Sequence, residues 1–261
     1  MSDCSRIQQY AEALRPFIES DEDFHRAHQE PTMIPQEVYE RLSRWISDSA
    51  SKIMWVEGPA FSPGSTALSK AALEATDKVL SAGIPCISYF CKSRSSFARS
   101  NAGGSGGGSG STPRLRHRDD AVISLCYSMI RQLAYVLPLE GFKADKALDA
   151  NQFEKLDGTL HSLPTALNIM NALFEYAPPV ICFVIDGLQD AGDRDSIKYL
   201  WNFIILLREQ MKDSSRVCKI LFTTDGRSEV LDRGTEVRER VDASRPVQAR
   251  GGRSFPGGVY I

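Results

Sequence analysis

The chain has 261 residues, of which 42% are hydrophobic and 25% are charged, as in an ordinary globular protein. Its 31 basic and 33 acidic residues give a formal net charge of −2, so no overall field attracts nucleic acid or lipid. The longest apolar run, 180–185, has the length of a strand and not of a membrane span, and the polar N-terminus carries no secretory signal. The six cysteines form no CxxC pair, so we expect no zinc site but buried thiols in an intracellular protein, cytoplasmic or nuclear.

Glycine is unevenly distributed along the chain. Six of the 19 glycines fall in 103–110, inside the run GGSGGGSGS, and four more lie in the last eleven residues. Such a regular Gly/Ser run is typical of a flexible engineered linker in place of a loop, so it is left out of the fold prediction.

Apolar spacing predicts the elements before this linker, in chain order. Residues 3–19 have a helical period, and a second helix starts at Pro35, because proline is favoured at the first helical position. The segment 52–58 is a short apolar strand that stops at a glycine, and 65–82 is a helix rich in Ala, Leu and Lys. The aromatic and β-branched residues of 84–92 predict a buried strand.

After the linker, strands and helices continue to alternate. Asp119 or Asp120 caps a helix that runs to residue 137, and Ser162 caps another that reaches Phe174. The segments that follow are a strand over 178–187, a helix over 194–212, a strand over 217–226, and a polar, Arg-rich end with one short helix near 236–241.

This alternation predicts an α/β fold in which helices cover both faces of a parallel sheet. Three parts follow: an N-terminal helical segment over 1–50 that packs as an appendage, a core over 51–230, and a polar tail over 231–261. In such sheets, ligands bind at the carboxyl ends of the strands. The segments 58–66, 186–190 and 223–227 therefore mark the candidate site.

The core segments resemble a known family when they are taken together. They are MWVEGPAFSPGSTAL, ISYFCKSRS, AVISLCYSMIRQL, VICFVIDGLQD and KILFTTDGRS, in that order between residues 50 and 230. They are similar to the P-loop core of NACHT or STAND nucleotide-binding proteins, especially the fungal ones. The resemblance implies a three-layer P-loop NTPase fold that binds ATP or ADP with Mg²⁺.

A P-loop wraps backbone N–H groups around phosphates, while its Lys neutralises their charge and its hydroxyl holds Mg²⁺. By resemblance, Gly58 takes the first glycine position, Ser65 is the hydroxyl that holds Mg²⁺, and Thr66 follows it. Pro63 replaces the second glycine and Gly64 replaces the lysine, so one N–H donor and the charge of the motif are lost. Gly58, Gly64, Ser65 and Thr66 are thus the predicted nucleotide-binding residues, and Lys70 is either a surrogate cation or a solvated helix residue.

The resemblance also assigns roles after the later strands. Asp186 would hold Mg²⁺ as the Walker B aspartate, and Asp190 stands where the family has its catalytic glutamate. Gln189 removes one carboxylate of the family form DGLDE. Alternatively, the two aspartates only cap the turn and the next helix. Arg227 is either a nucleotide-binding residue at the phosphates or an ordinary surface arginine.

Two functions follow from these departures. The first is a catalytically impaired pseudo-NTPase, a scaffold or interaction module excised from a larger regulatory protein, with no cofactor. The second is a signalling switch that still binds ATP or ADP with Mg²⁺ and hydrolyses it slowly. A small-molecule kinase has only the fold in its favour. We expect protein partners or self-association, and neither a membrane span nor nucleic-acid binding.

Overall fold

The computed structural model describes residues 3–18, 33–60, 67–91, 113–138, 142, 146–191, 194–243 and 258–260. Its α-helices are α1 (Asp3–Glu12), α3 (Gln36–Ser47), α4 (Ala67–Ser81), α6 (Pro113–Tyr135), α7 (Ala150–Glu154), α8 (Leu163–Phe174), α9 (Ile197–Gln210) and α10 (Glu229–Gly234). Its strands are β1 (Met33–Pro35), β2 (Lys52–Gly58), β3 (Cys86–Phe90), β4 (Val180–Asp186), β5 (Val217–Asp225), β6 (Arg240–Asp242) and β7 (Gly258–Tyr260). Short 3-10 turns are η1 (Arg15–Phe17), η2 (Lys146–Leu148), η3 (Leu160–Ser162), η4 (Leu188–Asp190) and η5 (Val237–Glu239).

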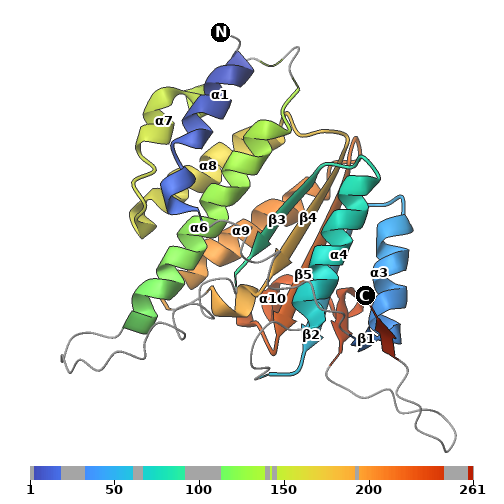
Figure 1. Ribbon diagram of the computed structural model, residues 1–261. Helices are drawn as coiled ribbons and strands as arrows, with labels where there is room; N and C mark the ends of the chain where they lie inside the picture. The colour runs from blue at the N-terminus through green and yellow to red at the C-terminus, as the bar shows by residue number, and fades with distance from the viewer. Residues whose placement is uncertain are drawn as a thin grey trace, which may run out of the picture.

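Five parallel strands form the central sheet in the order β3-β4-β5-β2-β6 (Figure 1). The chain starts in β2, moves out to β3 at one edge, returns through β4 and β5 to lie beside β2, and ends at β6 on the other edge. The connections that leave the neighbouring strands β2 and β5 run in opposite directions, and the crevice between two such strands is the usual place for a ligand in these sheets. A separate two-stranded sheet pairs β1 with β7 in antiparallel register beside α3.

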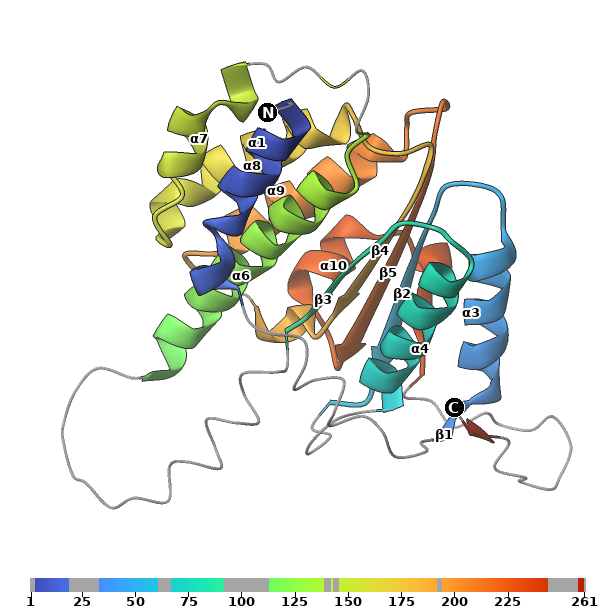
Figure 2. The same ribbon diagram turned by 45° about the horizontal axis from the view of Figure 1, so that its top comes forward.

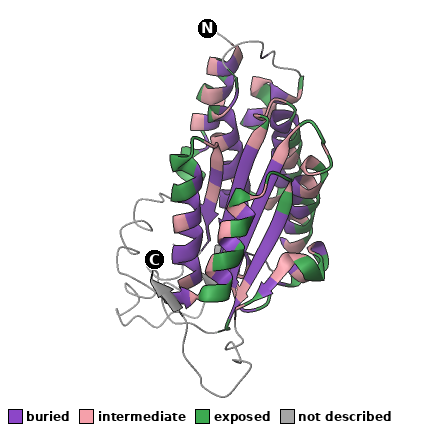
Figure 3. Ribbon diagram, turned by 90° about the vertical axis from the view of Figure 1, so that its right-hand side faces the viewer, coloured by how far each residue is buried: buried purple, intermediate pink, exposed green. Residues whose placement is uncertain are grey.

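Helices cover both faces of the sheet (Figure 2). α1, α6, α8 and α9 form one layer, and α3 and α4 form the other. The strand side chains alternate between the two layers: Ile53 and Trp55 of β2 pack toward α6, α8 and α9, whereas Met54 and Val56 pack toward α3 and α4. Figure 3 shows this buried sheet between two partly exposed helical layers. Because both strand faces are covered, the central parts of β2, β4 and β5 are mostly apolar, as in other parallel sheets.

The edge strand β3 is closed by a side chain of α6. Gln132 accepts a hydrogen bond from the Ser88 backbone N–H at 2.9 Å and donates one to the Ser88 carbonyl at 2.7 Å. Its Nε2 also reaches the Ser128 hydroxyl at 2.9 Å. The amide thus satisfies the Ser88 peptide groups at the edge in the way a neighbouring strand would, which blocks pairing with another chain at that point.

The three-layer α/β fold predicted from the sequence is confirmed, and it is consistent with a P-loop-like arrangement. All four predicted strands and all six predicted helices of the N-terminal and core segments are present, with shifted ends. α6 starts at Pro113, earlier than Asp119. The short helix predicted near 236–241 is wrong, because these residues form the 3-10 turn η5 and the unpredicted strand β6. The Gly/Ser run lies outside the described residues. No helix in the described ranges is long and apolar enough to cross a membrane.

Candidate functional site

The carboxyl ends of β2, β4 and β5 meet at one edge of the sheet. The Gly226 N–H donates to the Gly58 carbonyl at 2.9 Å, and the Gly187 N–H donates to the Thr223 carbonyl at 2.9 Å. Gly226 and Gly187 have φ of +83° and +78°, left-handed values that glycine adopts at little cost. Because these two turns are hydrogen-bonded to the neighbouring strands, β2, β4 and β5 end at the same edge of the sheet. Their last residues therefore lie next to one another.

Asp186 is the best-defined group of this edge. It is fully buried at the end of β4, and its two carboxylate oxygens accept hydrogen bonds of 2.6 Å from the hydroxyls of Ser69 and Thr223. Ser69 lies in the first turns of α4 and Thr223 lies on β5, so one carboxylate joins a helix to two strands. Two hydrogen bonds to a charged group offset much of the cost of burying it.

Asp190 and Gln189 lie in the short turn η4 that follows β4. The Gln189 side-chain amide donates to Asp190 Oδ2 at 3.1 Å, and both residues are half-buried. Gln189 Oε1 is buried with no hydrogen-bond partner among the described residues. The glutamine therefore engages the carboxylate that the resemblance assigns as a base.

The predicted phosphate-binding loop is described only at its ends. Gly58 closes β2, and a Cβ placed there would lie 2.7 Å from Leu68 Cδ1, so this glycine lets α4 pack closely against the strand end. Gly64, Ser65 and Thr66 lie outside the described residues, so their predicted roles remain predictions. Lys70 follows on α4 and is only 7% exposed, which contradicts its interpretation as a solvated helix residue.

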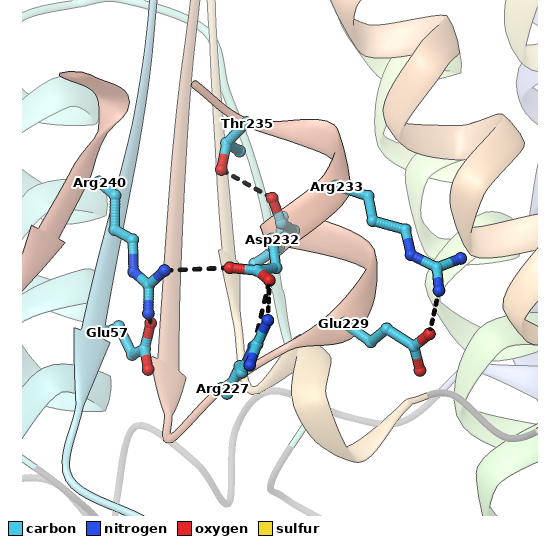
Figure 4. Close-up of polar contacts among 8 residues, drawn as sticks. Glu57, Arg227, Glu229, Asp232, Arg233, Thr235 and Arg240 are labelled. Carbon is cyan, nitrogen blue, oxygen red and sulfur yellow. Dashed lines mark hydrogen bonds and ion pairs between the residues drawn. The ribbon is translucent and has the colours of Figure 1, made fainter. Parts of the chain in front are cut away.

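Arg227 belongs to a network of ion pairs beside the same edge (Figure 4). Its guanidinium is paired with Asp232 of α10, with Nε 3.1 Å from Oδ2, and its side chain is 71% exposed. Arg240 Nη1 lies 3.0 Å from the other oxygen of Asp232, and the same guanidinium pairs with Glu57. It also lies over the Trp55 ring, 4.6 Å from the centroid. Arg227 as a phosphate contact stays a prediction, and Asp232 is the partner that the structure gives it.

The pKa of Asp232 is lowered, because Arg227 donates a hydrogen bond to its ionised form and burial only partly opposes this. The same contact raises the pKa of Arg227. Both groups are therefore held in their charged forms, and the charge of Arg227 is balanced within the protein.

The strand ends form an acidic rim, by which we mean Glu57, Asp186, Asp225 and Asp242. Asp186, Asp225 and Asp242 are the last residues of β4, β5 and β6, and Glu57 is the residue before the last of β2. Four of the five parallel strands thus bring a carboxylate to the edge where ligands bind in open sheets.

No three His, Cys, Asp or Glu side chains gather in a way that could hold a metal ion in the part of the chain that the structure describes. Of the predicted metal ligands, Asp186 is in place and Ser65 lies outside the described residues. A comparison with protein-family models, with curated proteins and with solved structures finds no significant match.

Sequence reasoning missed two contributors to this edge. Ser69 is the hydroxyl of α4 that reaches Asp186. Arg240 lies in a segment assigned to a polar tail, yet it pairs with Glu57. The helix predicted over 65–82 carries Ser69 near its start, and this could have revealed the first. No local pattern reveals the second, because the two partners are far apart in the chain.

Proposed function

We propose that this domain is a catalytically impaired P-loop-like module that serves as a scaffold or protein-interaction unit of a larger regulatory protein. The observation that carries the proposal is the acidic rim of Glu57, Asp186, Asp225 and Asp242 at the ligand edge of the sheet. A phosphate-binding edge needs positive charge, and the sequence has Gly64 where the resemblance expects lysine.

Electrostatics favours this proposal. Two like unit charges 4 Å apart repel each other by about 4 kcal/mol at an effective dielectric constant of about 20. A nucleotide triphosphate at this edge would face several carboxylates. The guanidiniums of Arg227 and Arg240 are paired with Asp232 and Glu57, so a triphosphate would have to compete with these carboxylates for them.

The hydrogen bonds that Asp186 makes within the protein support the same proposal. Both of its oxygens already accept a hydroxyl hydrogen bond, and the group joins α4 to the sheet. This is a structural role that needs no ligand. It differs from simple capping of the next turn, because the donors come from another helix and another strand.

Thermal unfolding in millimolar Mg-ATP or Mg-ADP tests the proposal. A ligand present at about 100 times its Kd stabilises a protein by roughly 2.7 kcal/mol, which moves the midpoint by several degrees in a chain of this size. We expect no shift and no nucleotide retained on purification. A magnesium-dependent shift that is lost in Asp186→Asn and kept in Asp77→Asn, an exposed aspartate of α4, would refute the impaired module.

One observation favours a nucleotide switch as the second candidate. A helix hydroxyl and a strand-end aspartate, Ser69 and Asp186, meet at 2.6 Å at the edge where a Mg²⁺-nucleotide would bind. A bound Mg²⁺ would offset part of the charge of the rim. This candidate predicts the Asp186-dependent thermal shift described above, together with slow phosphate release that Asp190→Asn reduces further.

Of the partners expected, a second copy of this chain can be tested for with the purified protein alone. Light scattering over a hundredfold range of concentration measures it directly. A mass that rises with concentration supports a self-associating module, whereas a constant monomer mass excludes self-association and leaves a different protein as the partner.

A further inference from the structure

Two cysteines lie directly opposite each other on neighbouring strands, away from the acidic rim. Cys86 opens the edge strand β3, and its register partner on β4 is Cys182. Neighbouring strands lie about 4.8 Å apart, within the range of Cα separations that a disulfide spans. Register partners in a parallel sheet also point to the same face. Here both thiols pack toward the layer of α3 and α4.

The two thiols differ in burial and in their part in a shared hydrogen bond. Cys86 is half-buried, whereas Cys182 is fully buried. The pKa of Cys182 is strongly raised, first by the hydrogen bond with Cys86 and then by burial. Cys182 therefore keeps its proton and donates it toward the Cys86 sulfur. Cys86 is the more exposed of the two residues, so we assign it as the thiol that a dissolved oxidant meets first.

Lys219 continues the same row on β5. It is the register partner of Cys182, it is buried, and its ammonium contacts the Trp45 carbonyl and lies 5.6 Å from the centre of the Trp45 ring. Its positive charge lowers the pKa of Cys182, which opposes part of the effect of burial. A negative charge that forms briefly on Cys182 would thus be stabilised from the side opposite Cys86.

We propose that Cys86 and Cys182 form a peroxide-oxidisable dithiol, with Cys86 as the attacking thiol and Cys182 as the resolving thiol. The Cys86 thiolate attacks one oxygen of hydrogen peroxide, the O–O bond breaks, and hydroxide leaves to become water. The product is a sulfenic acid on Cys86. Cys182 then attacks that sulfur, the S–S bond forms, the S–O bond breaks, and the departing hydroxide takes the Cys182 proton as a second water.

In this reaction the two sulfurs lose two electrons in all, and the peroxide gains them. The disulfide joins the edge strand β3 to its neighbour β4. It closes a long loop between residues 86 and 182, which lowers the conformational entropy of the unfolded chain. We therefore expect the oxidised protein to unfold at a higher temperature than the reduced protein.

The other cysteines provide internal controls. Cys4, Cys91, Cys126 and Cys218 are all buried. Burial raises the pKa of Cys126 and of Cys218 to about 12, which keeps these thiols protonated, so neither offers a thiolate for the first attack on peroxide. Cys218 lies on β5 next to the strand of Cys182 but packs toward the opposite helical layer. If nearness alone decided which cysteine forms a disulfide with Cys182, Cys218 would react as readily as Cys86. If strand register decides, only Cys86 reacts.

The experiment treats the reduced, folded chain with a small excess of hydrogen peroxide, quenches it in acid, blocks remaining thiols and maps peptides by mass spectrometry. We expect one cross-linked peptide, containing Cys86 and Cys182, with the loss of two hydrogen atoms, and its reversal by dithiothreitol. In Cys182→Ala, Cys86 should instead accumulate sulfenic acid that a 1,3-diketone probe traps. Cys218→Ala should behave like the wild type.

Three results would overturn the proposal. One is a Cys86 that reacts in the wild type without cross-linking to Cys182, and another is a cross-link that involves Cys218 instead. The third is a Cys86 that does not react at all while the folded protein stays intact. Cys86→Ser, a change at a half-buried position, provides the variant that keeps the fold and must abolish the cross-link.

Discussion

Gln132 makes a prediction that follows directly from its two hydrogen bonds to Ser88. Replacing it with alanine removes the acceptor at 2.9 Å and the donor at 2.7 Å, so the Ser88 peptide groups at the edge of β3 lose their partners. Each such bond contributes about 0.5–1.5 kcal/mol net. The higher helix propensity of alanine recovers a few tenths of a kcal/mol. We therefore expect Gln132→Ala to lower the free energy of unfolding by about 1–2 kcal/mol.

Urea unfolding followed by circular dichroism and tryptophan fluorescence measures this loss. Gln152→Ala is the matched control, because Gln152 is a helical glutamine whose side-chain carbonyl accepts a hydrogen bond from nearby Lys155 at the surface. It should change the free energy of unfolding by less than about 0.5 kcal/mol. Native-state hydrogen exchange gives a local readout, since the Ser88 amide should exchange faster in Gln132→Ala.

An unchanged Ser88 exchange rate together with an unchanged free energy of unfolding would show that Gln132 does not close the edge. If the edge is closed by this side chain, the variant should also associate at high concentration, because an open edge strand pairs with other chains. Sedimentation at several concentrations would detect such association.

Further predictions concern a turn and an ion pair. Gly158 has φ of +78° and a methyl group there would overlap the Phe17 ring, whereas Gly83 has φ of +74° and open space around it. Gly83→Ala should therefore cost about 1 kcal/mol in thermal unfolding, and Gly158→Ala distinctly more; equal losses would contradict the packing. Arg227 lowers the pKa of Asp232, so this ion pair stabilises the fold above the unfolded carboxyl pKa of about 3.9 and loses that effect as pH falls through the lower folded value. In Arg227→Ala, a carboxyl NMR titration should show the Asp232 pKa moving upward, and no movement would refute the assignment.

The sequence was most informative where burial is two-sided. The strands predicted over 178–187 and 217–226 match β4 and β5, because both faces of those strands are covered and their sequences are mostly apolar. β6 has three residues, of which two are charged, and its Arg240 pairs with Glu57, so no apolar signal marks it. Lys70 is a case in which the residue type alone predicts the wrong burial. A lysine predicts exposure, but α4 is packed between the sheet and α3, and its first turns are buried on all sides.

The candidate site was predictable only in part, for a related reason. Strand-end positions follow from the alternation of elements, so Asp186 could be placed at the correct edge from sequence alone. Its donors could not be placed. Ser69 and Thr223 are 117 and 37 residues from it, and only the packing of α4 across the sheet brings all three together. Partners of a buried charge are set by tertiary contacts, which carry no local pattern.

The strand order also determines how this chain can be assembled. Among the described strands, β2 has only β5 and β6 as neighbours, and Trp55 of β2 donates its hydrogen bond to Thr224, 169 residues further along. During synthesis, β2 therefore cannot pair with its neighbours until nearly the whole chain has been made. We expect this to slow folding and to leave the apolar faces of β2 exposed to chaperones in the meantime. A cut within 103–111 would leave β2 and β3 on a piece in which they are not neighbours. That piece could build its share of the sheet only together with the other piece, whose β4 and β5 lie between β3 and β2.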